Sequence, residues 1–294
     1  MKNMMISKLH IIIPENLLNL ELHSNIYKVY KMSENILQKI IDQKKTKIEK
    51  LKLEIDINSL LYTISKKDIF FDFKKKIQKS KSENKISIIA EIKKASPSAG
   101  ILIDDYDPVK IANIYNSKNV TCLSVLTEED FFLGNLSHIS EIKKKIELPI
   151  LCKDFFIDKF QVPLAKSYGA DAILIILAGI SEKTADELYE EALKHNMSVI
   201  VEVHTVEEAE KSVKYPDALI GINNRNLKTL KTEINTTYDI YNVVSNHSSP
   251  LISESGLKTK EELLDIKNKT SISTFLIGES LLKDLENNKI FSLL

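Results

Sequence analysis

The sequence predicts an α/β protein built as a (β/α)8 barrel with an N-terminal helical extension. From residue 86 onward, short apolar runs rich in β-branched residues alternate with segments whose apolar residues follow helical spacing. The runs are apolar on both faces, which is typical of parallel strands covered by helices. The chain has 294 residues, of which 43% are hydrophobic and 28% are charged. These values suit one barrel domain with a large core, and the repeated strand–helix pattern favours the TIM-barrel arrangement.

The segment before the barrel, residues 34–84, is expected to be helical. Apolar residues between Ile36 and Leu51 recur on one helix face. A second segment, between Leu60 and Phe73, is expected to pack near the barrel.

Residues 1–32 follow neither pattern. We interpret them as an N-terminal extension that is either disordered or the product of a mis-called start, with Met32 as the alternative start. Residues 33–294 are assigned to a single barrel domain. The intact mass of the native protein tests this interpretation.

Eight strands are expected in the barrel, separated by seven helical segments. The strands cover residues 86–91, 120–126, 149–153, 172–176, 198–203, 218–222, 251–253 and 274–277. The helical segments cover residues 108–116, 139–145, 159–167, 182–195, 206–213, 232–244 and 260–267. A doubly wound open sheet is the alternative, but that fold usually has fewer strands and a glycine-rich first turn, which this sequence lacks.

The composition argues against several classes of protein. The 41 basic residues balance 41 acidic ones, so a nucleic-acid-binding or membrane-surface protein is not expected. The sequence has neither an apolar run of membrane-spanning length nor a signal-peptide pattern, and we expect a cytoplasmic protein. Cys122 and Cys152 lie in apolar runs, which indicates core thiols in a reducing compartment. The six histidines show no ligand spacing, so no metal is expected; His204 is assigned a structural or rim role.

Ionisable and amide side chains stand at the carboxyl ends of four predicted strands, where barrel enzymes place their chemistry. They are Glu91 and Lys93, Lys153 and Phe155, Glu202, and Asn223 and Arg225. Because strand side chains alternate, residues two apart point the same way. One charged residue closing a strand is usually a solvated loop start, but four strands doing so together favour an active site. Glutamate and lysine in one pocket also shift each other's pKa, as acid–base catalysis requires.

Arg225 is the only arginine, and lysine supplies every other basic side chain apart from histidine. A guanidinium binds a carboxylate or phosphate through two parallel hydrogen bonds, which an ammonium cannot do. We therefore interpret Arg225 as an anion-binding residue, with chance retention as the alternative.

Small residues follow the last two predicted strands. Ser255 and Gly256 follow one, and Gly278 and Glu279 follow the other and open a helix. In phosphate-binding barrels, backbone N–H groups of these two loops hold the phosphate. Residues 96–100, after the first strand, are expected to form a structured active-site loop.

Together these motifs resemble the indole-3-glycerol phosphate synthase family. The resemblance covers about residues 33–283 and rests on residues 89–98, 123–128, 153–155, 201–204, 221–227, 254–256 and 276–280. The motifs after the first and sixth strands are specific to the family, and the phosphate turns are not. The chain departs from the pattern at Ala99, where the family often has lysine.

The resemblance implies a lyase of tryptophan biosynthesis that needs no cofactor. It would close the ring of 1-(2-carboxyphenylamino)-1-deoxyribulose 5-phosphate with loss of carbon dioxide and water. By carry-over, the catalytic residues would be Glu91, Lys93, Lys153, Glu202 and Asn223. The substrate-binding residues would be Ser96, Pro97, Phe155, Arg225 and Ser255, and the phosphate-binding residues Gly256, Gly278 and Glu279.

Within that set, Lys153 would be the general acid that protonates the ketone oxygen, and Glu202 the acid/base of the dehydration. A lysine holds its proton at neutral pH, and the pocket is expected to lower its pKa. Arg225 is assigned to the substrate carboxylate. Which lysine protonates in which step stays open.

Two other functions were weighed. A barrel resembling phosphoribosylanthranilate isomerase would favour a Cys/Asp acid–base pair. A catalytically dead barrel should have lost some of Glu91, Lys93, Lys153 and Glu202, yet all four are present. The expected partner is a small phosphorylated substrate, with no nucleic acid and no membrane. We expect a monomer, with a homodimer as the alternative.

Overall fold

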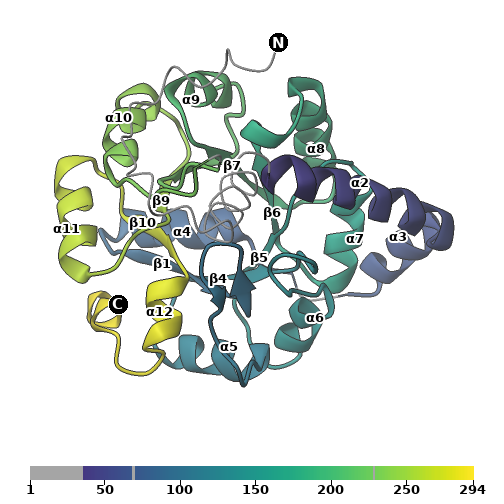
Figure 1. The fold of residues 1–294 in the computed structure, drawn as a ribbon, viewed down its shortest axis with the longest axis horizontal. Helices are drawn as coiled ribbons and strands as arrows, with labels where there is room; N and C mark the ends of the chain where they lie inside the picture. The colour runs from purple at the N-terminus through teal and green to yellow at the C-terminus, as the bar shows by residue number, and fades with distance from the viewer. Residues whose placement is uncertain (1–35, 68–69, 228) are drawn as a thin grey trace, which may run out of the picture.

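The structure is a computed structural model that describes residues 36–67, 70–227 and 229–294. The extension assigned to residues 1–32 lies outside these ranges. The described chain forms a closed barrel of eight parallel strands, which confirms the predicted fold class (Figure 1). The strands are β1 (Ser87–Ile92), β4 (Cys122–Leu126), β5 (Ile150–Lys153), β6 (Ala172–Ile176), β7 (Ser198–Val203), β8 (Leu219–Asn223), β9 (Leu251–Glu254) and β10 (Thr274–Ile277). Each pairs with the next in chain order, and β10 pairs with β1 to close the ring.

Helices surround the strands in a ring (Figure 1). They are α5 (Pro108–Ser117), α6 (Ser137–Lys143), α7 (Gln161–Tyr168), α8 (Glu182–Lys194), α9 (Val206–Ser212), α10 (Asn235–Val244), α11 (Lys260–Lys269) and the short α12 (Glu279–Lys283). Several begin at a side-chain cap; Asp107, Ser181, Thr205 and Thr259 each accept a hydrogen bond from the first turn. The start expected at residue 232 is wrong: α10 begins at Asn235, because Thr232 instead forms an isolated antiparallel bridge with Arg225.

Within the described ranges, three helices precede the barrel: α2 (Ile36–Glu54), α3 (Ile57–Ser65) and α4 (Phe73–Ser82). In Figure 1, α3 lies outside the helical ring and packs on α7, whereas α2 contacts the turn that follows β6. The segment expected between Leu60 and Phe73 therefore divides between two helices. Phe73 and Ile77 of α4 are fully buried against the first residues of the barrel strands, so α4 closes the amino end of the barrel.

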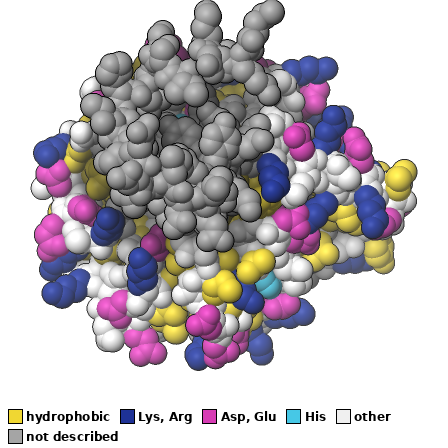
Figure 2. All heavy atoms as spheres, in the orientation of Figure 1, with side chains coloured by type: hydrophobic (Ala, Val, Ile, Leu, Met, Phe, Trp, Pro, Cys, Tyr) yellow, Lys and Arg dark blue, Asp and Glu magenta, His cyan; other side chains and the backbone are white. Residues whose placement is uncertain are grey.

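The core and surface agree with the composition. Cys122 and Cys152 are buried free thiols, as predicted. On the face shown in Figure 2, basic and acidic side chains of the described residues are interspersed, which fits the zero net charge. Of the helices in the described ranges, none combines the length and the apolar character that a membrane span requires.

Candidate active site

A cavity of about 590 Å³ opens at the carboxyl ends of the barrel strands. Eleven of the predicted site residues line it: Glu91, Lys93, Lys153, Phe155, Glu202, Asn223, Arg225, Ser255, Gly256, Gly278 and Glu279. The strand register explains this convergence, because Glu202 lies beside Gly221 on β8 and Asn223 lies beside Glu254 on β9. The structure thus brings together side chains that are up to about 190 residues apart in the chain.

Two predicted site residues, Ser96 and Pro97, do not line the cavity. They belong to a small hairpin formed by β2 (Ala95–Ser96) and β3 (Gly100–Ile101), which is the structured loop expected after the first strand. The hydroxyl of Ser96 accepts a hydrogen bond from the Ala99 N–H within this loop, at 3.2 Å. The loop reaches the pocket through Ser98, whose Oγ accepts a hydrogen bond of 2.6 Å from the Arg225 guanidinium. Ser98 is not among the site residues predicted from the sequence.

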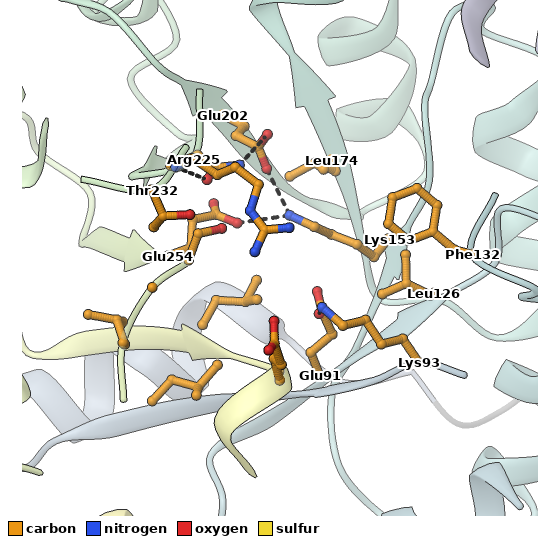
Figure 3. Close-up of a pocket in the computed structure, with 18 of the residues that line it drawn as sticks. Glu91, Lys93, Leu126, Phe132, Lys153, Leu174, Glu202, Arg225, Thr232 and Glu254 are labelled. Atoms are coloured by element: carbon orange, nitrogen blue, oxygen red, sulfur yellow. Dashed lines mark hydrogen bonds and ion pairs between the residues drawn. The ribbon is translucent and has the colours of Figure 1, made fainter. Parts of the chain in front are cut away.

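Lys153 lies between two carboxylates at the centre of the pocket. Its Nζ is 2.8 Å from Glu202 Oε2 and 2.8 Å from Glu254 Oε2 (Figure 3). The side chains of both glutamates are 2% exposed, whereas Lys153 is 15% exposed and faces the cavity. Asn223 Nδ2 donates to Glu202 Oε1 at 3.0 Å. These contacts hold the ammonium group in one position.

Glu254 is the main site residue that the sequence analysis missed. It ends β9 as Glu202 lies near the end of β7, and that position at a strand terminus was the available signal. In the sequence, Glu254 stands out only as the residue before the turn formed by Ser255 and Gly256.

The two carboxylates shift the pKa of Lys153 in the direction opposite to our expectation. Burial alone would lower the pKa, but Coulomb attraction to Glu202 and then Glu254 outweighs it and raises the pKa. The lowering of the Lys153 pKa that we expected from the sequence is therefore wrong.

The two glutamates differ in proton affinity. Burial raises the pKa of Glu254 to about 7, although Lys153 acts against this shift. Burial also disfavours the charged form of Glu202, but attraction to Lys153 and the contact with His204 together lower its pKa. Glu202 is thus an ionised carboxylate, and Glu254 is a group that can exchange a proton near neutral pH.

Glu91 and Lys93 form a second ion pair on the opposite side of the pocket, 2.5 Å apart (Figure 3). Glycines in neighbouring strands and turns make room for the buried carboxylates. A Cβ atom at Gly278 would lie 2.3 Å from Glu91 Oε1, and one at Gly221 would lie 2.3 Å from Glu254 Oε1. Both positions therefore require glycine if these glutamates are to keep their places.

The turn after β9 has an unusual backbone. Ser255 and Gly256 both have positive φ, 68° and 77°. The side chain of Asn224 stabilises this turn, because its Nδ2 donates to the Ser255 carbonyl at 3.1 Å while its Oδ1 accepts from the Thr237 hydroxyl at 2.8 Å. Asn224 belongs to the motif at residues 221–227, but it is not among the site residues predicted from the sequence. Its buried amide fixes the backbone that borders one end of the cavity.

The remaining wall is apolar. It includes Leu126, Phe132, Leu174, Ile176, Leu227 and Leu276. The rings of Phe132 and Phe155 lie 6.2 Å apart between centroids and are tilted by 40°. A pocket with one apolar wall and several fixed cations suits a ligand that carries both a flat ring and negative charge.

The sequence matches the family model described as indole-3-glycerol phosphate synthase over residues 37–293. The chain belongs to the indole-3-glycerol phosphate synthase family. This family match carries the assignment as a carboxy-lyase of tryptophan biosynthesis whose substrate is a phosphorylated small molecule.

Relatives that carry the name indole-3-glycerol phosphate synthase span most of the chain. The protein of Thermoanaerobacter pseudethanolicus is 38% identical over 252 residues, covering 86% of this chain and 94% of its own length. That of Bacillus licheniformis is 39% identical over 256 residues, covering 86% of this chain and 96% of its own length. Among solved structures, the tryptophan synthase alpha subunit of Legionella pneumophila aligns with a TM-score of 0.54 at 15% identity, covering 72% of this chain and 88% of that one. That likeness concerns the barrel fold alone.

Proposed function

We propose that this pocket converts 1-(2-carboxyphenylamino)-1-deoxyribulose 5-phosphate to indole-3-glycerol phosphate with Lys153 as the general acid. The observation that carries the assignment of Lys153 is its ammonium group, held by two buried carboxylates yet facing the cavity. A group in this position can donate to a substrate oxygen without first reorganising.

The substrate has three parts that the pocket can bind separately. The apolar wall with Phe132 and Phe155 would hold the aromatic ring. Arg225 would bind the ring carboxylate through its guanidinium fork. Backbone groups of the Ser255–Gly256 turn and of Gly278 and Glu279 would border the phosphate. The Glu279 carboxylate itself is paired with Lys283 at 2.7 Å, so it would take part only through its backbone.

Ring closure needs an acid at the ketone. The ring carbon that bears the carboxylate attacks the ketone carbon, and the ketone oxygen takes a proton from the Lys153 ammonium. The raised pKa of Lys153 is compatible with this step, because the developing alkoxide is a stronger base than an amine. Attack disrupts the aromatic ring, and loss of carbon dioxide from the same carbon returns the electron pair and restores aromaticity. No cofactor is required to accept those electrons.

Dehydration then needs one proton delivered and one removed. The new hydroxyl group leaves as water after protonation, and a carbon-bound proton is removed to complete the indole ring. Glu202 would serve as the acid/base of this step, with Glu91 and Lys93 as the second catalytic pair and Asn223 orienting Glu202. Glu254, with its pKa near 7, would return a proton to Lys153 at 2.8 Å.

The test is a fluorescence assay that follows indole-3-glycerol phosphate as it forms from the purified chain and the carboxyphenylamino substrate. We expect turnover without any added cofactor. Absence of product from a folded, substrate-saturated protein would contradict the proposal. We further propose a cytoplasmic monomer, with a homodimer as the alternative. Light scattering at assay concentration distinguishes the two oligomeric states.

A further inference from the structure

His204 lies directly after β7 and behind the pocket, out of reach of a substrate. Its side chain is 6% exposed, and it is not among the residues that line the cavity. Its Nε2 is 3.2 Å from Glu202 Oε1, on the side of Glu202 away from Lys153. Its Nδ1 is 3.2 Å from Glu208 Oε2 in the first turn of α9. Each ring nitrogen therefore faces one carboxylate.

This geometry favours a protonated ring. A neutral imidazole presents one donor and one acceptor, and the acceptor nitrogen would then face a carboxylate without a proton between them. The Nε2 contact also lacks the alignment of a hydrogen bond, so attraction to Glu202 depends on charge. Glu208 holds the residue in place twice, because the same Oε2 accepts the His204 backbone N–H at 2.8 Å.

We propose that His204 is a positioning residue that acts through Glu202: as an imidazolium held by Glu208, it keeps Glu202 ionised and in place while Lys153 gives up its proton. The inference rests on the proposed role of Lys153 as general acid. When Lys153 becomes neutral, Glu202 loses its cationic partner in the pocket. Asn223 supplies only a neutral donor, so His204 is the charge that remains beside Glu202.

The position of His204 also makes the two glutamates that contact Lys153 different from each other. Among the residues that the structure describes, no cation lies behind Glu254, and none hydrogen-bonds its Oε1, which is buried beside Gly221. While Lys153 gives up its proton, a proton therefore settles on Glu254 more readily than on Glu202. The pKa of His204 agrees with this difference between the two glutamates. Burial would lower that pKa, but the contacts with Glu202 and Glu208 outweigh burial and raise it to about 9.

The experiment compares His204→Gln and Glu208→Gln with the wild type. His204→Gln should lower kcat by about tenfold or more with KM changed less than about twofold, because the residue orients a catalytic group without touching substrate. In the wild type, kcat should fall as pH rises through about 9, where His204 loses its proton. Glu208→Gln should move this fall to lower pH, because the lost carboxylate no longer favours the imidazolium. His204→Gln should lack it.

His195→Gln is the matched control, because His195 also faces a glutamate, Glu191 at 3.2 Å, but on α8 outside the pocket. It should leave kcat and its pH profile unchanged. A 15N titration of the imidazole nitrogens, assigned with the His204→Gln spectrum, measures the His204 pKa without any turnover. A neutral His204 at pH 7, or a His204→Gln variant with wild-type kcat and an unmoved pH profile, would overturn the inference. Failure of the proposed function is distinct, since the wild type would then form no product while the titration still reports on His204.

Discussion

Gly221 lies on β8, where a methyl group would disturb catalysis without removing any functional group. An alanine Cβ there would lie 2.3 Å from Glu254 Oε1 and 3.0 Å from Ile200 Cγ2, whereas ordinary contacts begin at 3.4 Å. The Glu254 carboxylate must therefore move by about 1 Å, and a misplacement of that size costs about 10²-fold in rate. Because Glu254 Oε2 now lies 2.8 Å from Lys153, the movement breaks that ion pair. We expect Gly221→Ala to lower kcat by about 10²-fold and stability by about 1–3 kcal/mol.

The assay is indole-3-glycerol phosphate fluorescence under saturating substrate, with thermal unfolding measured in parallel. Gly179→Ala is the matched control, since its Cβ would meet only the flexible ends of Ile41, at 3.2 Å, and Leu37, at 3.6 Å, and Gly179 does not line the pocket. A double-mutant cycle identifies the route: in a Glu254→Ala background, Gly221→Ala should add little, because the group it displaces is gone. A folded Gly221→Ala variant with kcat within twofold of wild type would refute the reasoning.

Three further predictions concern single side chains. Lys153→Ala should lower kcat by about 10²-fold or more with a modest loss of substrate binding, and unchanged turnover would remove Lys153 from the mechanism. Arg225→Lys should weaken substrate binding by about 1–3 kcal/mol, measured by calorimetry, because the charge stays while the fork that now donates to Ser98 is lost; wild-type affinity would contradict this. The stability of the wild type should fall between about pH 6.5 and 9, because the folded state keeps the His204 proton, with its pKa raised to about 9, after the unfolded chain has released it. Denaturant unfolding of His204→Gln should show a flatter pH dependence over this interval, and an equal slope would show that His204 is not the group involved.

The fold could be predicted from the sequence because the barrel repeats one simple pattern. Each strand is buried on both sides and gives a continuous apolar run, so all eight were located to within one or two residues. The start of α10 could not be predicted, because the bridge between Arg225 and Thr232 is a tertiary contact that no local sequence pattern encodes. The same is true of α4, whose buried face is set by Phe73 and Ile77 meeting the barrel interior.

Most residues that line the pocket could be predicted from the sequence, apart from Glu254, but the electrostatics of the pocket could not. The alternation of side chains along each strand places Lys153 and Glu202 at the same end of the barrel, and the sequence alone indicated that they would interact. The sign of the pKa shift on Lys153 depends on how many carboxylates reach it, and Glu254 supplies the second from a strand about 100 residues away. The closeness of Glu254 and Lys153 in space follows only from closure of the barrel. The functional importance of Gly221 and Asn224 is likewise visible only once their neighbours across the sheet are known.

The distribution of charge in the pocket links substrate binding to proton uptake. Each carboxylate that lines the pocket is paired with a lysine: Glu91 with Lys93, Asp154 with Lys44, Glu202 and Glu254 with Lys153, and Glu279 with Lys283. A substrate with a phosphate and a carboxylate adds negative charge to this cluster and penalises whichever carboxylate is most weakly held. That carboxylate is Glu254, because burial already raises its pKa to about 7. An incoming dianion should raise this pKa further, so the substrate recruits a proton beside Lys153 before the ketone needs one.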